Sequence, residues 1–273
     1  NYSFLWRTSH FAYYVWDGAS LFMVVSGIVV GIVYRGRIAR LGMAAASIKL
    51  LRRAGLLYVL QLLLVLFALA TAYLLPSQGS SVFLLDDVSS FGQAALWALP
   101  MGANPIYVNF FSTYVIILIA AIPALWLLYR GRFVVFWLAL IVIYVAGILW
   151  PELFTLPNGP DSPANFDNAS WFALFMSGLL VGWMWQERDV DQVVMGPRMF
   201  WIITPAFAFL LLLAVWDALP SEPGPVWDWL SDKNTMAPVR FMAAWVFFIA
   251  AYWVLREVER WNWGARSVHQ LAI

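Results

Sequence analysis

Seven stretches of mostly apolar residues, separated by short polar connections, constrain this chain more than any other feature of its sequence. Most of them approach the roughly 20 residues that a helix needs to cross a bilayer. They cover 18–34, 54–75, 106–129, 133–150, 169–186, 199–217 and 236–256. We therefore expect an all-α, polytopic transmembrane bundle of about seven spans. The stretch 88–101 is too short to span and suits a helix lying in the membrane interface.

The composition agrees with a lipid-embedded chain and excludes several other classes. Only 11% of the residues are charged, against about 25% in soluble globular proteins. A net charge of +1 gives no reason to expect nucleic-acid binding. Cysteine is absent, which excludes disulfides and thiolate metal sites, and the two histidines, His10 and His269, lie at opposite ends of the chain. A metal site is therefore not expected.

The basic residues fall in alternate connections between the seven stretches. If those connections face the cytoplasm, they hold 13 of the 16 lysines and arginines. Eight acidic residues lie in the opposite connections: Asp86, Asp87, Glu152, Asp161, Asp167, Glu222, Asp228 and Asp232. This pattern satisfies the positive-inside rule at each turn of a seven-span path and places the N-terminal segment outside.

Two of the stretches share a short glycine motif. Gly27 and Gly31 lie four residues apart in one stretch, and Gly178 and Gly182 repeat that spacing in another. Glycines at this spacing share one face of a helix and allow two backbones to approach closely. We interpret both motifs as helix-packing surfaces.

The first basic connection, residues 35–53, carries the densest group of charges and has two interpretations. The guanidinium groups of Arg35, Arg37, Arg52 and Arg53 suit the phosphates of a nucleotide-bearing donor such as a coenzyme A thioester. Alternatively, these arginines set the topology and contact anionic lipid headgroups. The sequence alone favours the second interpretation.

Polar residues within the stretches are few. Arg240 lies about one turn inside the last stretch, where it would either snorkel outward or pair with Asp17 or another outer carboxylate. A second set could form a polar track between helices or ordinary interhelical hydrogen bonds: Gln61, Asn109, Ser112 and Thr113. His10 has the chemistry of a general base, although a histidine among aromatic residues also suits a membrane interface.

Several segments resemble one family of bacterial membrane enzymes. They run from Asp17 to Gly31, Leu50 to Tyr58, Asn104 to Tyr114, Ile122 to Trp126, Phe166 to Gly178 and Trp263 to Ser267. In this order they resemble the OpgC family, succinyltransferases that modify osmoregulated periplasmic glucans within the acyltransferase type 3 superfamily. The resemblance implies a bundle of about ten helices that carries an acyl group from cytoplasmic coenzyme A to an extracytoplasmic hydroxyl.

The chain departs from the family pattern at identifiable positions. The Arg and His pair that the family uses to activate the acceptor would precede Asn1. Ser20 occupies the position of an acidic residue, and Leu56 interrupts a basic run that continues past Arg53 in the family. We therefore expect one transmembrane domain, 1–273, that lacks one or more helices at each end.

Two functions follow from the resemblance. The first is an O-acyltransferase in the bacterial cytoplasmic (inner) membrane, which uses acyl-CoA as donor substrate and a glycan as acceptor, with His10 as a candidate catalytic base. The second is a catalytically silent relative that serves as a structural subunit of a larger membrane protein complex. Membrane lipid is a partner in either case.

Overall fold

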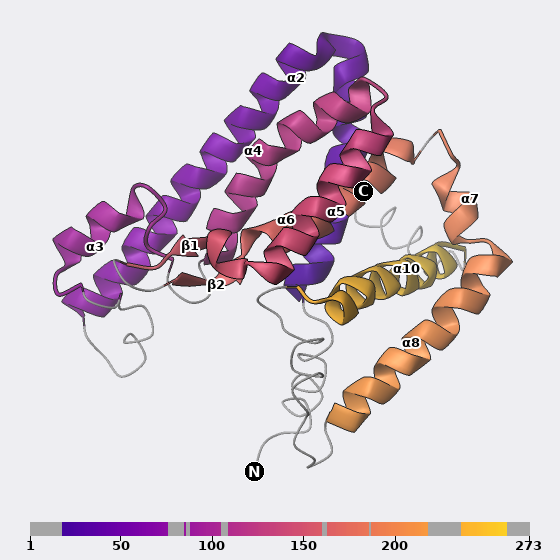
Figure 1. Ribbon diagram of the computed structural model, residues 1–273. Helices are drawn as coiled ribbons and strands as arrows, with labels where there is room; N and C mark the ends of the chain where they lie inside the picture. Colours follow the sequence, from indigo (N-terminus) through magenta and orange to yellow (C-terminus); the bar gives the residue numbers. More distant parts are fainter. Residues whose placement is uncertain are drawn as a thin grey trace, which may run out of the picture. The chain divides into compact units, whose positions relative to one another are not determined.

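The computed structural model describes residues 18–75, 85, 88–104, 109–159, 163–185, 187–217 and 236–260, and most of these are helical (Figure 1). The helices are α2 (Gly18–Leu74), α3 (Phe91–Ala98), α4 (Asn109–Tyr129), α5 (Phe133–Leu149), α6 (Asn168–Met184), α7 (Val190–Val194), α8 (Pro197–Asp217) and α10 (Pro238–Arg260). A 3₁₀ turn, η2 (Pro151–Leu153), precedes two short strands, β1 (Thr155–Pro157) and β2 (Pro163–Asp167). All seven predicted stretches thus fall on helices, and the predicted short helix is α3.

The first basic connection is not a loop, which corrects the expectation for residues 35–53. This segment is helical throughout except at Gly42, whose backbone has φ 80° and ψ 164°. Its residues are mostly alanine, leucine, lysine and arginine, which are strong helix formers. Glycine alone tolerates the positive φ that the break requires. The predicted helix ends at 34 and 54 are wrong, because charged residues can continue a helix and do not by themselves indicate a loop.

The break at Gly42 divides α2 into two limbs, 18–41 and 43–74. An unbroken helix of 57 residues would be about 86 Å long at a rise of 1.5 Å per residue, nearly three times the roughly 30 Å thickness of a bilayer core. The first limb would measure about 36 Å and the second about 48 Å. In Figure 1 the helix rises along one limb and descends along the other, with the bend at the top of the view.

The chain forms two compact units. One of them, called the α4 unit here, comprises 27–183 and Met236. It therefore contains most of α2 together with α3 to α6. One core of this unit joins the far end of α2 to α3 through Val65, Leu69, Ala94 and Ala98. Ser90 caps α3, since its side chain accepts a hydrogen bond from the Gln93 N–H.

A two-stranded antiparallel sheet in the same unit leads directly into α6. Asp167, at the end of β2, accepts hydrogen bonds from the backbone N–H groups of Ala169 (2.9 Å) and Ser170 (3.1 Å) and from the Ser170 hydroxyl. The carboxylate is only 1% exposed, and these donors at a helix N-terminus stabilise its charge. Asp167 therefore holds the start of α6.

The two glycine motifs pack against each other, as their spacing predicted. A Cβ built on Gly27 would lie 2.1 Å from the Phe175 carbonyl oxygen, and one on Gly31 would lie 2.3 Å from that of Leu179. On the other helix, a Cβ on Gly182 would lie 2.1 Å from the Ile28 carbonyl oxygen. The first limb of α2 and α6 therefore cross with their backbones in contact, which only residues without a side chain permit.

The second unit, called the α10 unit here, contains α7, α8 and α10 among its described residues. Its core lies between α8 and α10, where Ile203 and Leu210 meet Ala243 and Val246. The Trp253 indole N–H donates to the Val194 carbonyl oxygen at 2.6 Å, which ties the end of α7 to α10.

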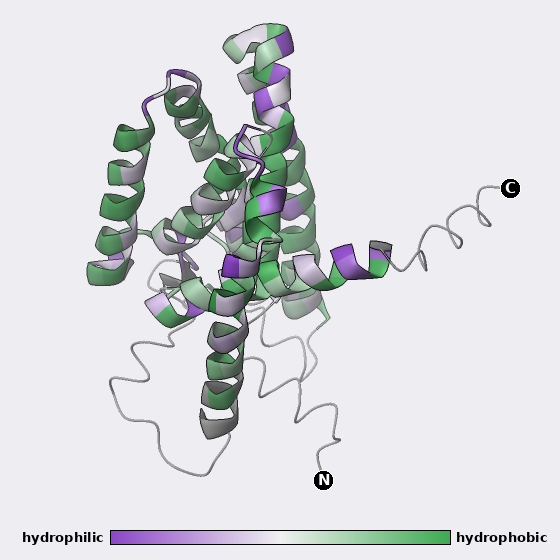
Figure 2. Cartoon of the chain, turned by 90° about the vertical axis from the view of Figure 1, so that its right-hand side faces the viewer, coloured by the Kyte–Doolittle hydropathy of each residue, from purple (hydrophilic) through white to green (hydrophobic). Residues whose placement is uncertain are grey.

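The surfaces of these helices are those of a membrane protein. Large apolar side chains are widely exposed, such as Phe67 (73%), Val134 (71%) and Val142 (64%), and apolar colour runs along the helices in Figure 2. Such a surface would aggregate in water. In the described residues, α2, α4 and α10 have the length and composition of a span, while α5, α6 and the apolar part of α8 are shorter. The finer expectation of seven spans in a ten-helix protein stays a prediction.

Candidate functional site

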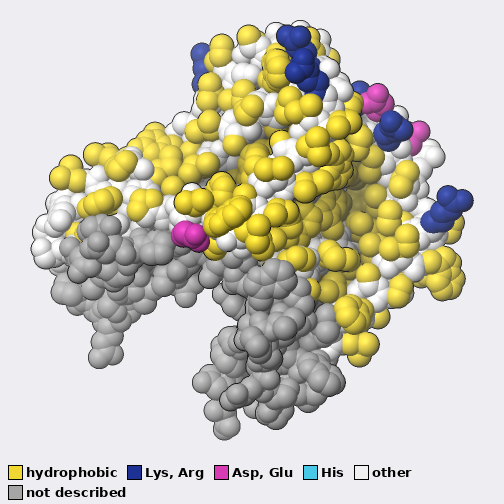
Figure 3. Space-filling view, in the orientation of Figure 1, with side chains coloured by type: hydrophobic (Ala, Val, Ile, Leu, Met, Phe, Trp, Pro, Cys, Tyr) yellow, Lys and Arg dark blue, Asp and Glu magenta, His cyan; other side chains and the backbone are white. Residues whose placement is uncertain are grey.

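The four arginines predicted to bind a donor all lie on α2, but they fall on different limbs. Arg35 and Arg37 precede the break at Gly42, and Arg52 and Arg53 follow it. Figure 3 shows Lys and Arg side chains gathered at the top of the molecule, over the bend in α2. The structure thus divides the predicted donor residues into two pairs.

The first pair is held by aromatic neighbours. Arg35 Nη1 donates to the Trp183 carbonyl oxygen, and its guanidinium lies 5.7 Å from the centroid of the Trp183 ring. Arg37 lies 4.8 Å from the centroid of the Tyr34 ring. Tyr34 is 1% exposed, and its hydroxyl has no hydrogen-bond partner within the described part of the chain. Arg35 therefore links the C-terminal part of α2's first limb to the end of α6.

In the second pair, Arg53 contacts a different helix, α4. Arg53 Nη2 lies 3.5 Å from the Tyr114 hydroxyl of α4, the outer limit for a hydrogen bond. The side chain of Tyr114 is buried and meets the Phe175 ring of α6 edge-on, with centroids 6.1 Å apart. Arg52 and Arg53 are both exposed. Arg53 thus presents a guanidinium beside α4 that is available to a further partner.

The contact with Tyr114 places the Arg53 guanidinium away from the Tyr129 end of α4, where the turn to α5 lies. Tyr114 lies near the start of α4, about 22 Å from the other end of the helix at Tyr129. This distance exceeds the reach of a tyrosine side chain, so the guanidinium lies alongside the body of α4. A cation beside a helix of spanning length and apolar composition is uncommon and usually serves a function. The charges of residues 35–53 predict a loop and hence a surface connection for Arg53, whereas the structure places Arg53 on α2 beside α4.

A buried polar track lies between the same two helices, as expected. Gln61 Nε2 donates to the Ser112 hydroxyl at 2.8 Å. Gln61, Ser112, Thr113 and Asn109 are each exposed by 3% or less. Gln61 Oε1 and Asn109 Oδ1 accept no hydrogen bond from the described residues, which makes them available to a hydroxyl donor.

Two asparagines anchor the opposite end of the α4 unit. Asn104 Nδ2 donates to the carbonyl oxygens of Met101 (2.6 Å) and Pro157 (2.8 Å). Asn168 Nδ2 donates to the Phe154 carbonyl oxygen at 2.6 Å. Both asparagines bind the segment that contains η2 and β1, so their role here is to hold connections in place.

The segments that carry the family resemblance therefore converge on α4. Arg53 and Gln61 of α2 meet Tyr114 and Ser112, and Phe110 meets the Trp171 ring of α6 edge-on at 6.2 Å. Tyr114 ends one of the segments that resemble the family, but the sequence analysis does not identify it as a candidate site residue. A hydroxyl within an apolar span, two residues from Ser112, was the signal that could have identified it.

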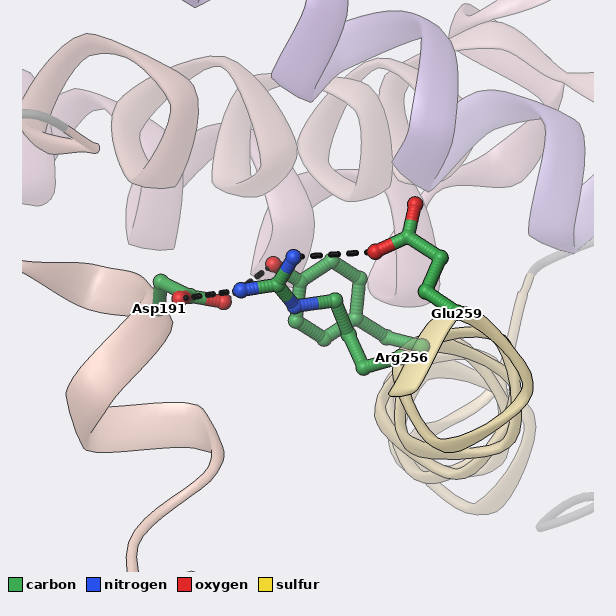
Figure 4. A network of polar contacts seen from close by, with 4 residues as sticks. Asp191, Arg256 and Glu259 are labelled. Atoms are coloured by element: carbon green, nitrogen blue, oxygen red, sulfur yellow. Dashed lines mark hydrogen bonds and ion pairs between the residues drawn. The ribbon is translucent and has the colours of Figure 1, made fainter. Parts of the chain in front are cut away.

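The α10 unit carries a separate polar network, drawn in Figure 4. Arg256 forms ion pairs with Asp191 of α7 at 2.9 Å and with Glu259 at 3.0 Å, and the Tyr252 hydroxyl donates to Asp191. The Asp191 and Arg256 side chains are 38% and 42% exposed, so water or salt screens the pair and it adds little stability. The ion pair instead fixes a position, because it holds the α6–α8 connection against the end of α10.

The remaining positions that the sequence analysis named add no residue to the site between α2 and α4. His10 and Asp17 lie outside the described residues, and Arg240 is buried at 4% exposure. No group of three His, Cys, Asp or Glu side chains that could hold a metal occurs in the described portion of the chain.

Comparison with known proteins supplies the family. The family model described as OpgC protein matches residues 2–273. No curated protein and no solved structure matches the chain. A match over nearly the whole length, together with apolar helices of spanning length, shows that this membrane protein belongs to the OpgC family.

Proposed function

We propose that this protein is an integral membrane O-acyltransferase of the OpgC type, which moves a succinyl or similar acyl group from cytoplasmic coenzyme A to an extracytoplasmic glycan hydroxyl. The observation that carries the proposal is the position of Arg53. Its guanidinium lies beside the buried Tyr114, at the point where the segments of the family resemblance meet.

The chemistry of acyl transfer gives this cation a role. A coenzyme A donor carries phosphates, which guanidinium groups bind through charge-assisted hydrogen bonds. The thioester carbonyl also develops negative charge in the transition state, and a fixed cation or hydroxyl donor stabilises that charge. In the proposed mechanism Arg53 contacts the donor, Tyr114 orients Arg53, and the arginines nearer the bend, Arg35 and Arg37, guide the nucleotide. His10 is the candidate base for the acceptor hydroxyl.

A transfer assay on the purified full-length protein in proteoliposomes tests this proposal. Radiolabelled succinyl-CoA is supplied on one side and a glucan acceptor on the other. We expect Arg53→Gln to lower kcat/KM for the donor at least tenfold and Tyr114→Phe to lower it severalfold. Arg40→Gln is the matched control, since Arg40 is an exposed arginine of α2 whose Nε donates to the carbonyl oxygen of Gly36 in the same helix, at 3.2 Å.

Two results of this assay would contradict the proposal. Equal activity of Arg53→Gln and Arg40→Gln would remove Arg53 from the donor site. A wild-type protein that is folded yet inactive with several acyl-CoA donors would contradict the enzyme proposal itself.

The second candidate function is that of a catalytically silent subunit in a larger membrane complex. It is favoured by Ser20, which stands where the family pattern has an acid and is only 3% exposed in α2. Loss of an acid that orients a catalytic base removes most of the rate in well-studied enzymes. Stoichiometric recovery with other membrane proteins in mild detergent, from a protein without transfer activity, is the result expected of this function.

A further inference from the structure

An apolar hollow of about 170 Å³ lies between α4, α5 and α6 of the α4 unit. Its walls include Ala120, Pro123 and Leu127 from α4 and Phe136 and Ala139 from α5, and polar atoms contribute almost nothing to them. Pro123 is exposed, whereas Phe136 is buried, so the wall of the hollow extends from the interior to the exposed side of α4 at Pro123. The ligand that suits such walls is a hydrocarbon chain, because a charged acyl group would lose its hydration there without compensation.

The hollow begins one helical turn from the connection between α4 and α5. Leu127 lies three residues before Arg130, and Phe136 lies four residues after Arg132. From Leu127 the hollow extends along α4 to Ala120, a distance of about 10 Å. A chain that enters at the connection would therefore run toward the middle of the bundle.

The connection itself has a defined backbone. The Arg132 N–H donates to the Leu127 carbonyl oxygen at 2.9 Å, and the Gly131 N–H donates to that of Leu128 at 3.0 Å. With Gly131 at φ 66°, these bonds make the Schellman motif that ends many helices. The motif fixes the positions of Arg130 and Arg132 on either side of one glycine.

The two arginines share one aromatic ring. Their guanidinium carbons lie 5.3 Å (Arg130) and 5.7 Å (Arg132) from the centroid of Trp126. Both are exposed, and neither forms an ion pair with a described carboxylate. Two cations held at one ring repel each other, and a bound anion would relieve that repulsion.

We propose that the α4–α5 connection and the adjoining hollow bind one anionic phospholipid. The phosphate contacts Arg130 and Arg132 beside Trp126, and one acyl chain occupies the hollow between α4, α5 and α6. The charges at the α4–α5 connection and the apolar walls that begin one helical turn away match the two ends of such a lipid. This site is independent of the proposed transferase function and of Arg53.

Photo-crosslinking tests the site on the full-length protein in nanodiscs. The probe is phosphatidylglycerol with a diazirine in one acyl chain, and labelled peptides are mapped by mass spectrometry. We expect labelling within 120–127 and 136–143, reduced at least fivefold in the double variant Arg130→Gln/Arg132→Gln. The control, Arg40→Gln/Lys49→Gln, removes the same charge from exposed positions of α2 and should label as the wild type does.

Two further arms separate the headgroup from the chain. Ala139→Phe fills the hollow without changing the charge, and we expect it to abolish labelling there. A phosphatidylcholine probe should label at least fivefold less. The proposal is overturned if the arginine double variant or Ala139→Phe labels as the wild type does, if phosphatidylcholine labels equally, or if soluble glycerol phosphate displaces the probe.

Discussion

At the scale of single residues, the pair formed by Gln61 and Ser112 tests what a buried hydrogen bond contributes in this bundle. Both side chains are almost completely buried, and their contact at 2.8 Å joins α2 to α4. Interhelical hydrogen bonds in membranes average about 0.6 kcal/mol. Ser112→Ala removes the acceptor of a buried amide, so we expect it to destabilise the protein by about 1 kcal/mol. Reversible unfolding in mixed micelles measures this loss.

The matched change is the double variant Gln61→Leu/Ser112→Ala. It replaces both partners by apolar groups, which leaves no unpaired donor and should recover most of the lost stability. If the effects of the two single changes simply add, the residues are not coupled and the proposed hydrogen bond does not contribute.

At the scale of elements, the crossing of α2 and α6 depends on glycine at the point of contact. Gly31→Ala places a Cβ 2.3 Å from the Leu179 carbonyl oxygen, and this backbone atom cannot rotate away. We expect the helices to separate and the protein to lose about 1–3 kcal/mol, the usual cost of overpacking a core. Thermal unfolding in detergent, followed by size-exclusion chromatography, measures the loss.

Gly55→Ala provides the control for this prediction. Gly55 also lies in α2, but a Cβ there would meet no atom within 4 Å. Alanine favours a helix over glycine by about 1 kcal/mol, so this change should leave the melting temperature unaltered or raise it. Equal destabilisation by both substitutions would show that backbone contact is not the reason for glycine at 31.

At the scale of the whole molecule, each unit by itself contains charged residues whose side of the membrane the positive-inside rule predicts. In the α4 unit, Arg130 and Arg132 lie at the turn between α4 and α5, and Glu152 follows the other end of α5. In the α10 unit, Arg256 in the last turns of α10 pairs with Asp191 of the α6–α8 connection, and the positive-inside rule predicts the same side for both.

The absence of cysteine makes this topology directly measurable. Single cysteines at Gly131 and Gln192 should react with a membrane-impermeant maleimide only from the cytoplasmic side. Cysteines at Ser89 and Glu152 should react only from the opposite side; all four positions are exposed. Modification of Gly131→Cys and Glu152→Cys from the same side would contradict a crossing by α5.

Much of the architecture could be read from apolar periodicity and the position of charges. Lipid is the surrounding solvent, so a helix must be apolar along its length, and residues such as Leu63 and Val134 had to be on helices wherever they packed. The same reasoning identified the glycine motifs, because a missing side chain is visible in the sequence. His10, the donor itself and the glycan acceptor stay predictions of the family resemblance.

Only the tertiary structure decided which residues meet. The sequence assigned Arg53 to a loop because its charges resemble a polar connection, whereas helix-forming neighbours continue α2 through it and bring the guanidinium to Tyr114. The sequence does not show which helix each glycine motif packs against. Nor does it show that Arg130 and Arg132 lie at one aromatic ring near an apolar hollow. Hydropathy determines where a segment can reside, while contacts between distant segments depend on the crossing of helices in three dimensions.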